Sequence, residues 1–225
     1  MASGGDFTCS SALRERIADN LSRFSVRRLD AEAGTRAAVA VVVVDAAGGT
    51  GGLHLAYHDG DASTAALVLT RRAAHLTNHA GQWALPGGRM DRGETAEAAA
   101  LRELSEEVSL HLSPHRVMGR LDDFATRSGF VMTPVVIWGG SGVCLSANPE
   151  EVASIHRIPV SEFLREDAPV LESSPAGDEP VLLMPVGDNF IAAPTAAVIF
   201  QFREVGLLGA ATRVAHYDQP FFAWR

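Results

Sequence analysis

The sequence is poor in cysteine. Only two cysteines occur among its 225 residues, Cys9 and Cys144. Two cysteines provide neither a disulfide framework nor a cysteine-rich zinc site. Residues 1–6 also lack a basic region followed by an apolar one, so they do not predict a secretory signal. We therefore expect a protein of the reducing cytoplasm.

Long apolar runs and basic tracts are absent as well. The longest apolar run, Ala37–Val44, has the length of a strand, whereas a membrane helix needs roughly 18 to 20 apolar residues. The net charge is −8, with no long cluster of lysine and arginine, which argues against nucleic acid as a partner. A small anionic substrate remains compatible if a bound cation and a few arginines offset the acidic background. We expect neither a membrane nor a nucleic-acid partner.

Apolar periodicity predicts an α/β protein. Helices are expected in three segments: Ser10–Phe24, Thr95–Val108 and Pro194–Val205. Strands are expected in four segments: Ala37–Asp45, Ala65–Thr70, Val131–Trp138 and Val181–Pro185. Because strands and helices alternate irregularly, the order predicts a mixed sheet between helices.

Three finer expectations follow from the same pattern. Pro134 interrupts its strand, which predicts a position near an edge of the sheet. Glu166–Pro180 is acidic and contains proline, serine and glycine, so it predicts a surface loop. The length suits one globular domain with an extension. We expect a helical extension over residues 1–34 and a single domain over residues 35–225.

The helix predicted over Thr95–Val108 carries an unusual set of carboxylates. Glu106 follows Glu103 by three residues and Glu107 follows it by four. The three side chains therefore crowd one side of the helix, opposite an apolar stripe. A glutamate-rich helix is commonly just a solvated face. Crowded carboxylates repel one another, however, unless a cation joins them. Oxygen ligands together with a phosphate-containing substrate suit Mg²⁺ or Mn²⁺.

The complete pattern extends beyond this helix. It consists of Gly88, five residues, Glu94, seven residues, and then the run Arg102-Glu103-Leu104-Ser105-Glu106-Glu107-Val108-Ser109-Leu110. This pattern resembles the Nudix box, G-x5-E-x7-R-E-U-x-E-E-x-G-U, where U is a bulky aliphatic residue. Ser109 replaces the last glycine of the box, which usually closes the helix in a left-handed conformation. A serine in that conformation costs about 1 kcal/mol.

The resemblance implies a fold and a set of roles. The fold would be the Nudix α/β/α sandwich. Mg²⁺ or Mn²⁺ would be bound by Glu103, Glu106, Glu107 and the carbonyl of Gly88. The catalytic residues implied are Glu94, Arg102, Glu103 and Glu106, with Arg102 and Glu94 orienting the cluster. The proton of the attacking water would pass to a glutamate of the box, such as Glu103, or to a residue in a later loop, and the sequence does not decide between them.

Residues flanking the box narrow the range of candidate substrates. Four segments are similar to the coenzyme A diphosphatase branch of the Nudix family: Leu67–Gly88, Thr126–Val135, Asn148–Val152 and Ile158–Val160. Two features depart from that branch. Leu85 stands where an aromatic residue is usual, and the box opens with Asp91-Arg-Gly-Glu94, as in ordinary Nudix enzymes.

Several flanking side chains are candidates for substrate binding. Arg71, Arg72 and His79 follow the second predicted strand, and Arg127 and Ser128 lie in the downstream segment. Arginine suits the third phosphate of coenzyme A. The histidine could instead be a plain loop residue, and Ser128 could simply form a turn with the glycine that follows it. A zinc site at His79 lacks further ligands.

The resemblance therefore implies metal-dependent hydrolysis of the diphosphate of coenzyme A or acyl-coenzyme A. The products would be (acyl-)phosphopantetheine and adenosine bisphosphate. One alternative is a broader hydrolase of nucleoside-diphosphate-linked compounds, such as ADP-ribose, NADH or nucleoside triphosphates. Another is a non-catalytic nucleotide-sensing module, although such modules commonly lose carboxylates of the box. The resemblance also makes a homodimer an expectation.

Overall fold

The computed structural model describes residues 6–30, 35–49, 53, 55, 61–76, 79–174 and 177–220. Within these residues the strands are β1 Thr35–Asp45, β2 Ala65–Arg72, β3 Trp83–Ala84, β4 Gly87–Arg89, β5 Val117–Arg120, β6 Phe124–Ala125, β7 Phe130–Gly140, β8 Val152–Pro159, β9 Val170–Glu172, β10 Val181–Val186 and β11 Asn189–Ala192. The helices are α1 Ser11–Arg23, α2 Ala96–Val108, α3 Val160–Phe163 and α4 Thr195–Gln201, with a 3₁₀ turn η2 Pro114–Arg116 and a π-helical turn η3 Phe202–Leu207.

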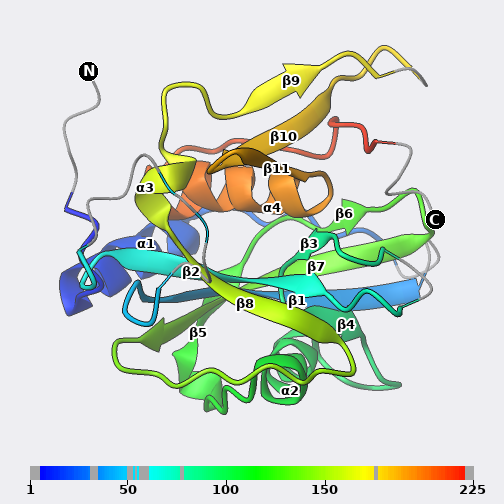
Figure 1. Cartoon of the computed structure of the whole chain (residues 1–225). Helices are drawn as coiled ribbons and strands as arrows, with labels where there is room; N and C mark the ends of the chain where they lie inside the picture. The colour runs from blue at the N-terminus through cyan, green and yellow to red at the C-terminus, as the bar shows by residue number, and fades with distance from the viewer. Residues whose placement is uncertain are drawn as a thin grey trace.

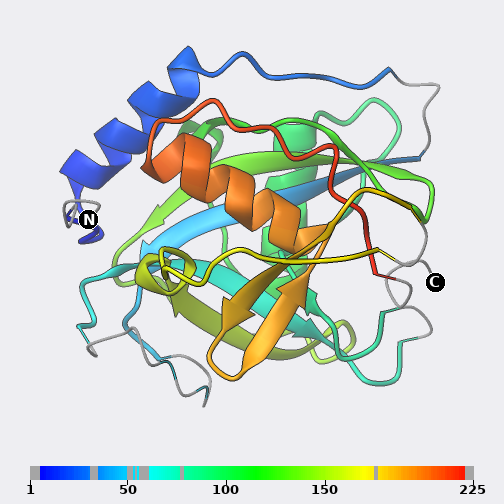
Figure 2. The same ribbon diagram turned by 90° about the horizontal axis from the view of Figure 1, so that it is seen from above.

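The predicted mixed sheet between helices is confirmed. Its main path is β3-β2-β1-β7-β5, with β8 paired to β2, β4 to β1 and β6 to β7. Strands β1 and β7 run parallel, and the other pairs are antiparallel. Helix α2 covers one face, whereas α1, α4 and a second sheet of order β11-β10-β9 lie on the other side (Figures 1 and 2).

Side-chain size along β1 distinguishes the two faces of the sheet. Because side chains alternate along a strand, the alanines at positions 38 and 40 join one core cluster, with Ala99 and Ala100 of α2. Val39 and Val41 join the other cluster, with residues of α1 and α4. The small residues on the α2 side let this helix lie close to the sheet, which places its carboxylates against the backbone of β4.

The predicted edge position of the strand with Pro134 is wrong. Strand β7 lies between β1 and β5. The carbonyl of Pro134 accepts from the backbone of Leu121, which follows β5 and precedes β6. In a strand the nitrogen and the carbonyl of one residue point to the same side. The proline nitrogen, which has no hydrogen to donate, therefore faces the interruption between β5 and β6, so no ladder bond is lost.

Two further boundaries differ from the prediction. The segment Glu166–Pro180 is not wholly loop, because its residues 170–172 form β9 and pair with β10. The helix expected over Pro194–Val205 divides into α4 and the π turn η3. Local apolar pattern did not indicate either change, since both depend on contacts with β10 or within the C-terminal layer.

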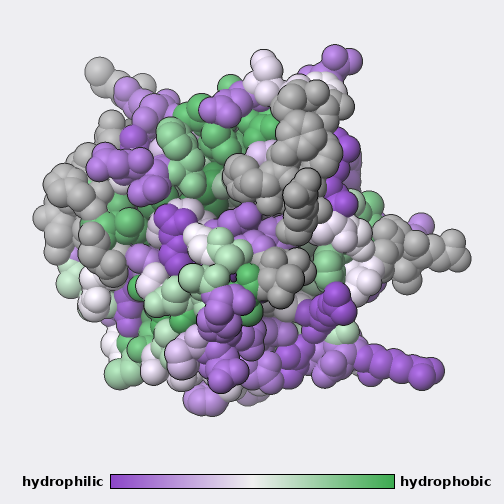
Figure 3. Space-filling view, turned by 45° about the vertical axis from the view of Figure 1, so that its right-hand side comes forward, coloured by the Kyte–Doolittle hydropathy of each residue, from purple (hydrophilic) through white to green (hydrophobic). Residues whose placement is uncertain are grey.

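The surface differs in polarity from one layer to the other. Figure 3 shows hydrophilic side chains gathered over the lower part of the molecule, at the level of α2, and hydrophobic ones higher up. Leu171 of β9 and Phe190 of β11 belong to the upper sheet and are more than half exposed. No described helix combines the length and the apolar character needed to cross a membrane.

Candidate active site

Two glycines bring the carboxylates of α2 against the sheet. Strand β4 pairs with β1, so that Gly87 lies opposite Val39 and Gly88 opposite Ala38. A Cβ on Gly88 would lie 2.3 Å from Oε1 of Glu103, and one on Gly87 would lie 2.4 Å from the carbonyl oxygen of Ala38. Only glycine allows so close an approach at either position.

The ends of α2 position the acidic side of the helix. Thr95 caps the N-terminus, where its hydroxyl accepts from the backbone of Ala98 at 3.2 Å. Ser109 ends the helix in the left-handed conformation, with φ 56° and ψ 27°, as expected for the position of the box glycine. The following backbone N–H, of Leu110, donates to the carbonyl of Leu104 at 3.1 Å, which satisfies a carbonyl of the last turn.

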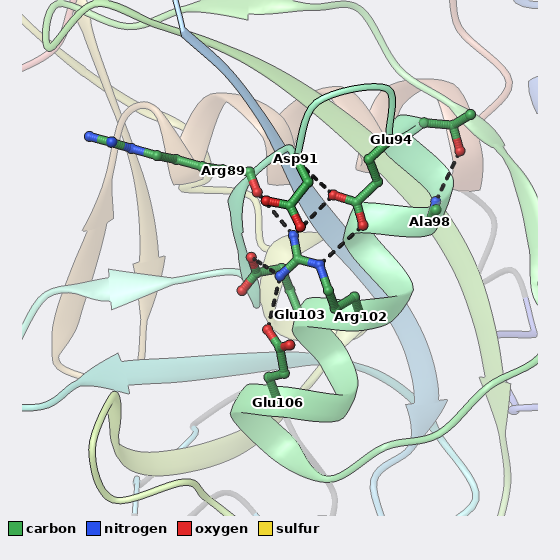
Figure 4. Close-up of polar contacts among 8 residues, drawn as sticks. Arg89, Asp91, Glu94, Ala98, Arg102, Glu103 and Glu106 are labelled. Carbon is green, nitrogen blue, oxygen red and sulfur yellow. Dashed lines mark hydrogen bonds and ion pairs between the residues drawn. The ribbon is translucent and has the colours of Figure 1, made fainter.

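Arg102 is the hub of the charged cluster (Figure 4). Its Nε and Nη2 donate to the two carboxylate oxygens of Glu94 at 3.0 and 3.1 Å. Its Nη1 donates to Glu103 and to Glu106, both at 2.9 Å, and Nη2 also donates to the carbonyl of Arg89 at 3.0 Å. Hydrogen bonds from Arg102 hold the pKa of Glu94 below its ordinary value. A planar, multidentate guanidinium thus fixes the loop before α2 to the acidic side of the helix.

Two carboxylates of the cluster are buried. Glu103 is 8% exposed and Glu107 is 4% exposed. Burial raises the pKa of Glu107 to about 8, and the nearby carboxylates of Glu103 and Glu151 add to that rise. Burial also raises the pKa of Glu103, although Arg102 opposes the change. Burial therefore disfavours the charged forms of both carboxylates in the absence of a nearby cation.

Glu151 is a member of the site that the sequence did not single out. It lies between β7 and β8, and its charge raises the pKa of both Glu103 and Glu107. Its backbone accepts from Ala73, while Asn148 of the same loop donates to the carbonyl of Glu107 at 2.9 Å. The Asn148–Val152 motif contained this residue, but only the docking of the loop on α2 brings its carboxylate to the cluster.

The residues of the cluster suit a divalent cation. Among the described residues no three acidic, histidine or cysteine side chains are already arranged as a metal site, because Glu103 and Glu106 are turned to Arg102. The donors are nevertheless all oxygens, as Mg²⁺ and Mn²⁺ prefer. Burial raises the pKa of Glu107, and a bound cation would favour its charged form.

A cavity of about 630 Å³ opens beside β4, whose three residues all line it. It runs over the ends of β1, β4 and β7, and its apolar wall includes Val39, Leu85, Phe130 and Met132. Its polar lining includes Arg72, His79, Gln82 and Arg89, and no acidic side chain occurs among the described residues that line it. In a chain of net charge −8, this cavity suits an anionic ligand.

The predicted substrate-binding residues fall into two groups. Arg72, His79 and Ser128 line the cavity. Arg71 instead lies over the ring of Trp83, 3.9 Å from its centroid, and donates to the carbonyl of Gly81. Arg127 forms an ion pair of 2.8 Å with Asp218. Arg71 and Arg72 have different surroundings because the side chains of neighbouring residues point to opposite faces of β2.

Arg89 is a cavity residue that the sequence did not single out. Its side chain points away from the glutamates (Figure 4) and lies over the ring of Phe130, 5.2 Å from its centroid. Its position directly after Gly88 was visible in the sequence, but the side of β4 to which it points was not.

Fold and site together define an α/β protein in which an acidic helix and a Gly-Gly strand meet beside a cationic cavity. Residues 34–174 match the model of the NUDIX domain. The chain belongs to the NUDIX family.

Relatives agree with this assignment. The chain is 43% identical over 99 residues to the uncharacterized Nudix hydrolase NudL of Photorhabdus laumondii, a match that covers 44% of this chain and 53% of the relative. It is also 43% identical over 100 residues to the protein of the same name from Yersinia enterocolitica, covering 44% of this chain and 51% of that one. The chain thus spans about half the length of the curated relatives it matches.

A solved structure shares the fold. A crystal structure of a MutT/nudix family protein from Enterococcus faecalis aligns with a TM-score of 0.52 at 16% identity, covering 86% of this chain and 73% of that chain. At this identity the likeness concerns the fold alone. It agrees with the mixed sheet and its helical layers.

Proposed function

We propose that this chain is a divalent-metal-dependent hydrolase that cleaves the diphosphate of coenzyme A or its thioesters. The single observation that carries the proposal is the juxtaposition at Gly88. The buried Glu103 of α2 lies against this residue, which also lines the cavity together with Arg72 and Arg89. Charge that requires a cation and a cavity that requires an anion thus adjoin one another.

The roles proposed for the cluster are those that the resemblance to the Nudix box implies. Glu103, Glu106 and Glu107, with the carbonyl of Gly88, would hold the cation, and the ion pairs of Arg102 support its role, with Glu94, in keeping the array in place. A bound Mg²⁺ or Mn²⁺ would neutralise diphosphate oxygens and favour attack by water. Glu103 and Glu151 are the two carboxylates proposed to accept the proton of the attacking water.

The cavity supports the choice of coenzyme A. Arg72 and Arg89 line it, and neither forms an ion pair with an acidic residue among the described part of the chain. Coenzyme A carries one phosphate beyond its diphosphate, and guanidinium groups suit such a group. His79 and Ser128 add hydrogen-bonding groups to the lining.

A hydrolysis screen of the purified chain tests the proposal. Coenzyme A, acetyl-coenzyme A, ADP-ribose, NADH and nucleoside triphosphates are incubated with Mg²⁺ or Mn²⁺, and the phosphate-containing products are resolved. We expect phosphopantetheine and adenosine bisphosphate from coenzyme A, and no product after chelation. Turnover of ADP-ribose with coenzyme A untouched would favour the broader hydrolase. Nucleotide binding without turnover of any compound would favour a sensing module.

A further inference from the structure

The cavity beside Gly88 is closed by residues from outside the segment that matches the family. Pro194 and Thr195, at the start of α4, and Gln219, near the end of the described chain, all line it. The match to the family ends at residue 174. We call these three residues the roof. The carboxylates and the wall of the cavity thus come from the shared segment, whereas the roof comes from the C-terminal layer.

The roof and the arginines of the lining differ in charge. Thr195 and Gln219 of the roof carry a hydroxyl and an amide group, Thr126 and Ser128 add further hydroxyl groups, and Met132 provides an apolar surface. Arg127, in the same loop, is neutralised by its ion pair with the buried Asp218. A charged group therefore finds its partners in Arg72 and Arg89, and an uncharged group finds them in the roof and in Thr126 and Ser128.

The roof is anchored to the wall of the cavity by hydrogen bonds. Arg127 donates from Nε to Asp218 at 3.0 Å, and Ser174 donates to the other oxygen of Asp218 at 2.6 Å. The backbone N–H of Arg127 donates to the side chain of Gln219, whose amide donates to the carbonyl of Ala125. Thr195 donates weakly to the carbonyl of Trp83, at 3.5 Å. These bonds join the C-terminal layer to both β3 and the loop between β6 and β7.

We infer that the roof selects the uncharged group attached to the diphosphate, with Thr195 and Gln219 as specificity-determining residues. Its ligand is a chain with an apolar body and amide or hydroxyl groups, as in the pantetheine arm of coenzyme A. The ion pair of Arg127 with Asp218 positions the roof without touching this group. The inference rests on the proposed function, since it names the part of the substrate that the cavity binds.

Competing substrates test the inference. One is coenzyme A, and the other is 3′-phosphoadenosine 5′-diphosphate with a methyl ester in place of the pantetheine arm. A Thr195→Trp substitution fills the space under the roof, so the ratio of kcat/KM for coenzyme A to that for the methyl ester should fall at least about tenfold. Asn189→Trp, at an exposed position of β11, is the matched control and should keep the ratio of the unaltered protein. An unchanged ratio in folded Thr195→Trp would overturn the inference.

Two further variants guard against misfolding. Thr195→Leu adds less volume and should lower the same ratio to a smaller extent. Asp218→Asn removes the charge that holds Arg127, so it should raise KM for coenzyme A several-fold at nearly constant kcat, whereas general destabilisation would lower the active fraction and hence kcat. A loss of kcat with unchanged KM in Asp218→Asn would contradict the positioning role.

A binding measurement separates this inference from the proposed function. The dissociation constant of 4′-phosphopantetheine, measured by calorimetry, requires no turnover. Weaker binding to Thr195→Trp than to Asn189→Trp supports the roof even if the chain hydrolyses nothing, in which case only the proposed reaction fails. Equal binding to both variants, with active hydrolysis of coenzyme A, rejects the roof and leaves the reaction in place.

Discussion

At the scale of single residues, the candidate site depends on carboxyl groups that the fold buries. Glu107 is nearly inaccessible and has a pKa raised to about 8 by burial. Glu103 lies against Gly88, where no other residue would leave room for its carboxylate. Buried carboxylates reduce the stability of the metal-free protein. Groups with pKa values perturbed in this way are common in functional sites.

Replacing Glu107 by glutamine should reduce Mg²⁺-dependent hydrolysis at least about 100-fold, because the cation loses a charged ligand. Glu172→Gln, on the exposed β9, serves as the control and should retain activity. Initial rates over a range of Mg²⁺ concentrations provide the measurement. Full activity of the Glu107 variant would contradict the metal assignment.

The same variant has an opposite effect on stability. Folding raises the pKa of Glu107 from 4.5 to about 8. The protonated carboxyl group therefore contributes its full stabilisation below pH 4.5, and this contribution is lost as the pH rises through 8. Glutamine has no such dependence. In metal-free buffer above pH 8, Glu107→Gln should therefore unfold at a higher temperature than the unaltered chain.

A methyl group at Gly88 should be incompatible with the site. Gly88→Ala places a Cβ 2.3 Å from Oε1 of Glu103, so the carboxylate of Glu103 must move. A misplacement of about 1 Å in a catalytic site costs about 100-fold in rate. Gly177→Ala meets no atom within 4 Å and should leave kcat/KM unchanged. Comparable activity of both variants in a coenzyme A assay would show that Glu103 need not occupy its present place.

At the scale of elements, helix α2 carries most of the carboxylates of the candidate site. Its alanine-rich side packs on the alanines of β1, and its other side presents the glutamates to β4 and to the loop before β8. The helix ends at Ser109 with positive φ, so the last turn, which holds Glu106 and Glu107, is closed by a residue that is strained in this conformation.

Relief of that strain should stabilise the protein. Ser109→Gly should increase the free energy of unfolding by up to about 1 kcal/mol, which raises the melting temperature by about 2–4 °C for a chain of this size. Ser109→Ala retains the Cβ and hence the strain, so it should bring no gain. Thermal unfolding of the three proteins provides the comparison. A lower melting temperature for the glycine variant than for the alanine variant would refute the account.

At the scale of the whole molecule, buried carboxylates join segments that are distant in the sequence. Asp122, between β5 and β6, accepts from the backbone of Arg27 at 2.7 Å and from Gln201 of α4 at 2.9 Å. It also forms an ion pair of 2.6 Å with Arg213. We propose that residues 1–34 are an extension docked in this way on a single domain formed by residues 35–225.

Removal of Asp122 should therefore weaken the whole fold. Asp122→Ala removes the carboxylate that accepts from the amide of Gln201 and pairs with the guanidinium of Arg213, at a cost of about 3 kcal/mol or more. Asp19→Ala breaks only the exposed ion pair with Arg23 and should change stability little. Urea unfolding followed by circular dichroism measures both. Equal stability of the two variants would show that Asp122 does not join the segments.

The sequence by itself determined the class of the fold and the residues of the acidic helix. Glutamates at helical spacing, the preceding glycine and the buried strands are local patterns, and local patterns follow from the periodicity of helices and strands. The resemblance to the Nudix box predicted the left-handed end of α2 at Ser109, which the structure confirms. The predicted edge position of the strand with Pro134 was wrong, because long-range pairing decides which strands lie beside β7.

Only the tertiary structure decided which side chains meet. Glu151 reaches Glu103 and Glu107 from another loop, and Arg89 rather than Arg71 lines the cavity. Arg127 turns to Asp218, which is 91 residues away in the chain. Gln219 and Thr195 close the cavity from a layer beyond the segment shared with the family. Their positions depend on how strands pair and layers pack, and these contacts between distant segments leave no periodic trace in the sequence.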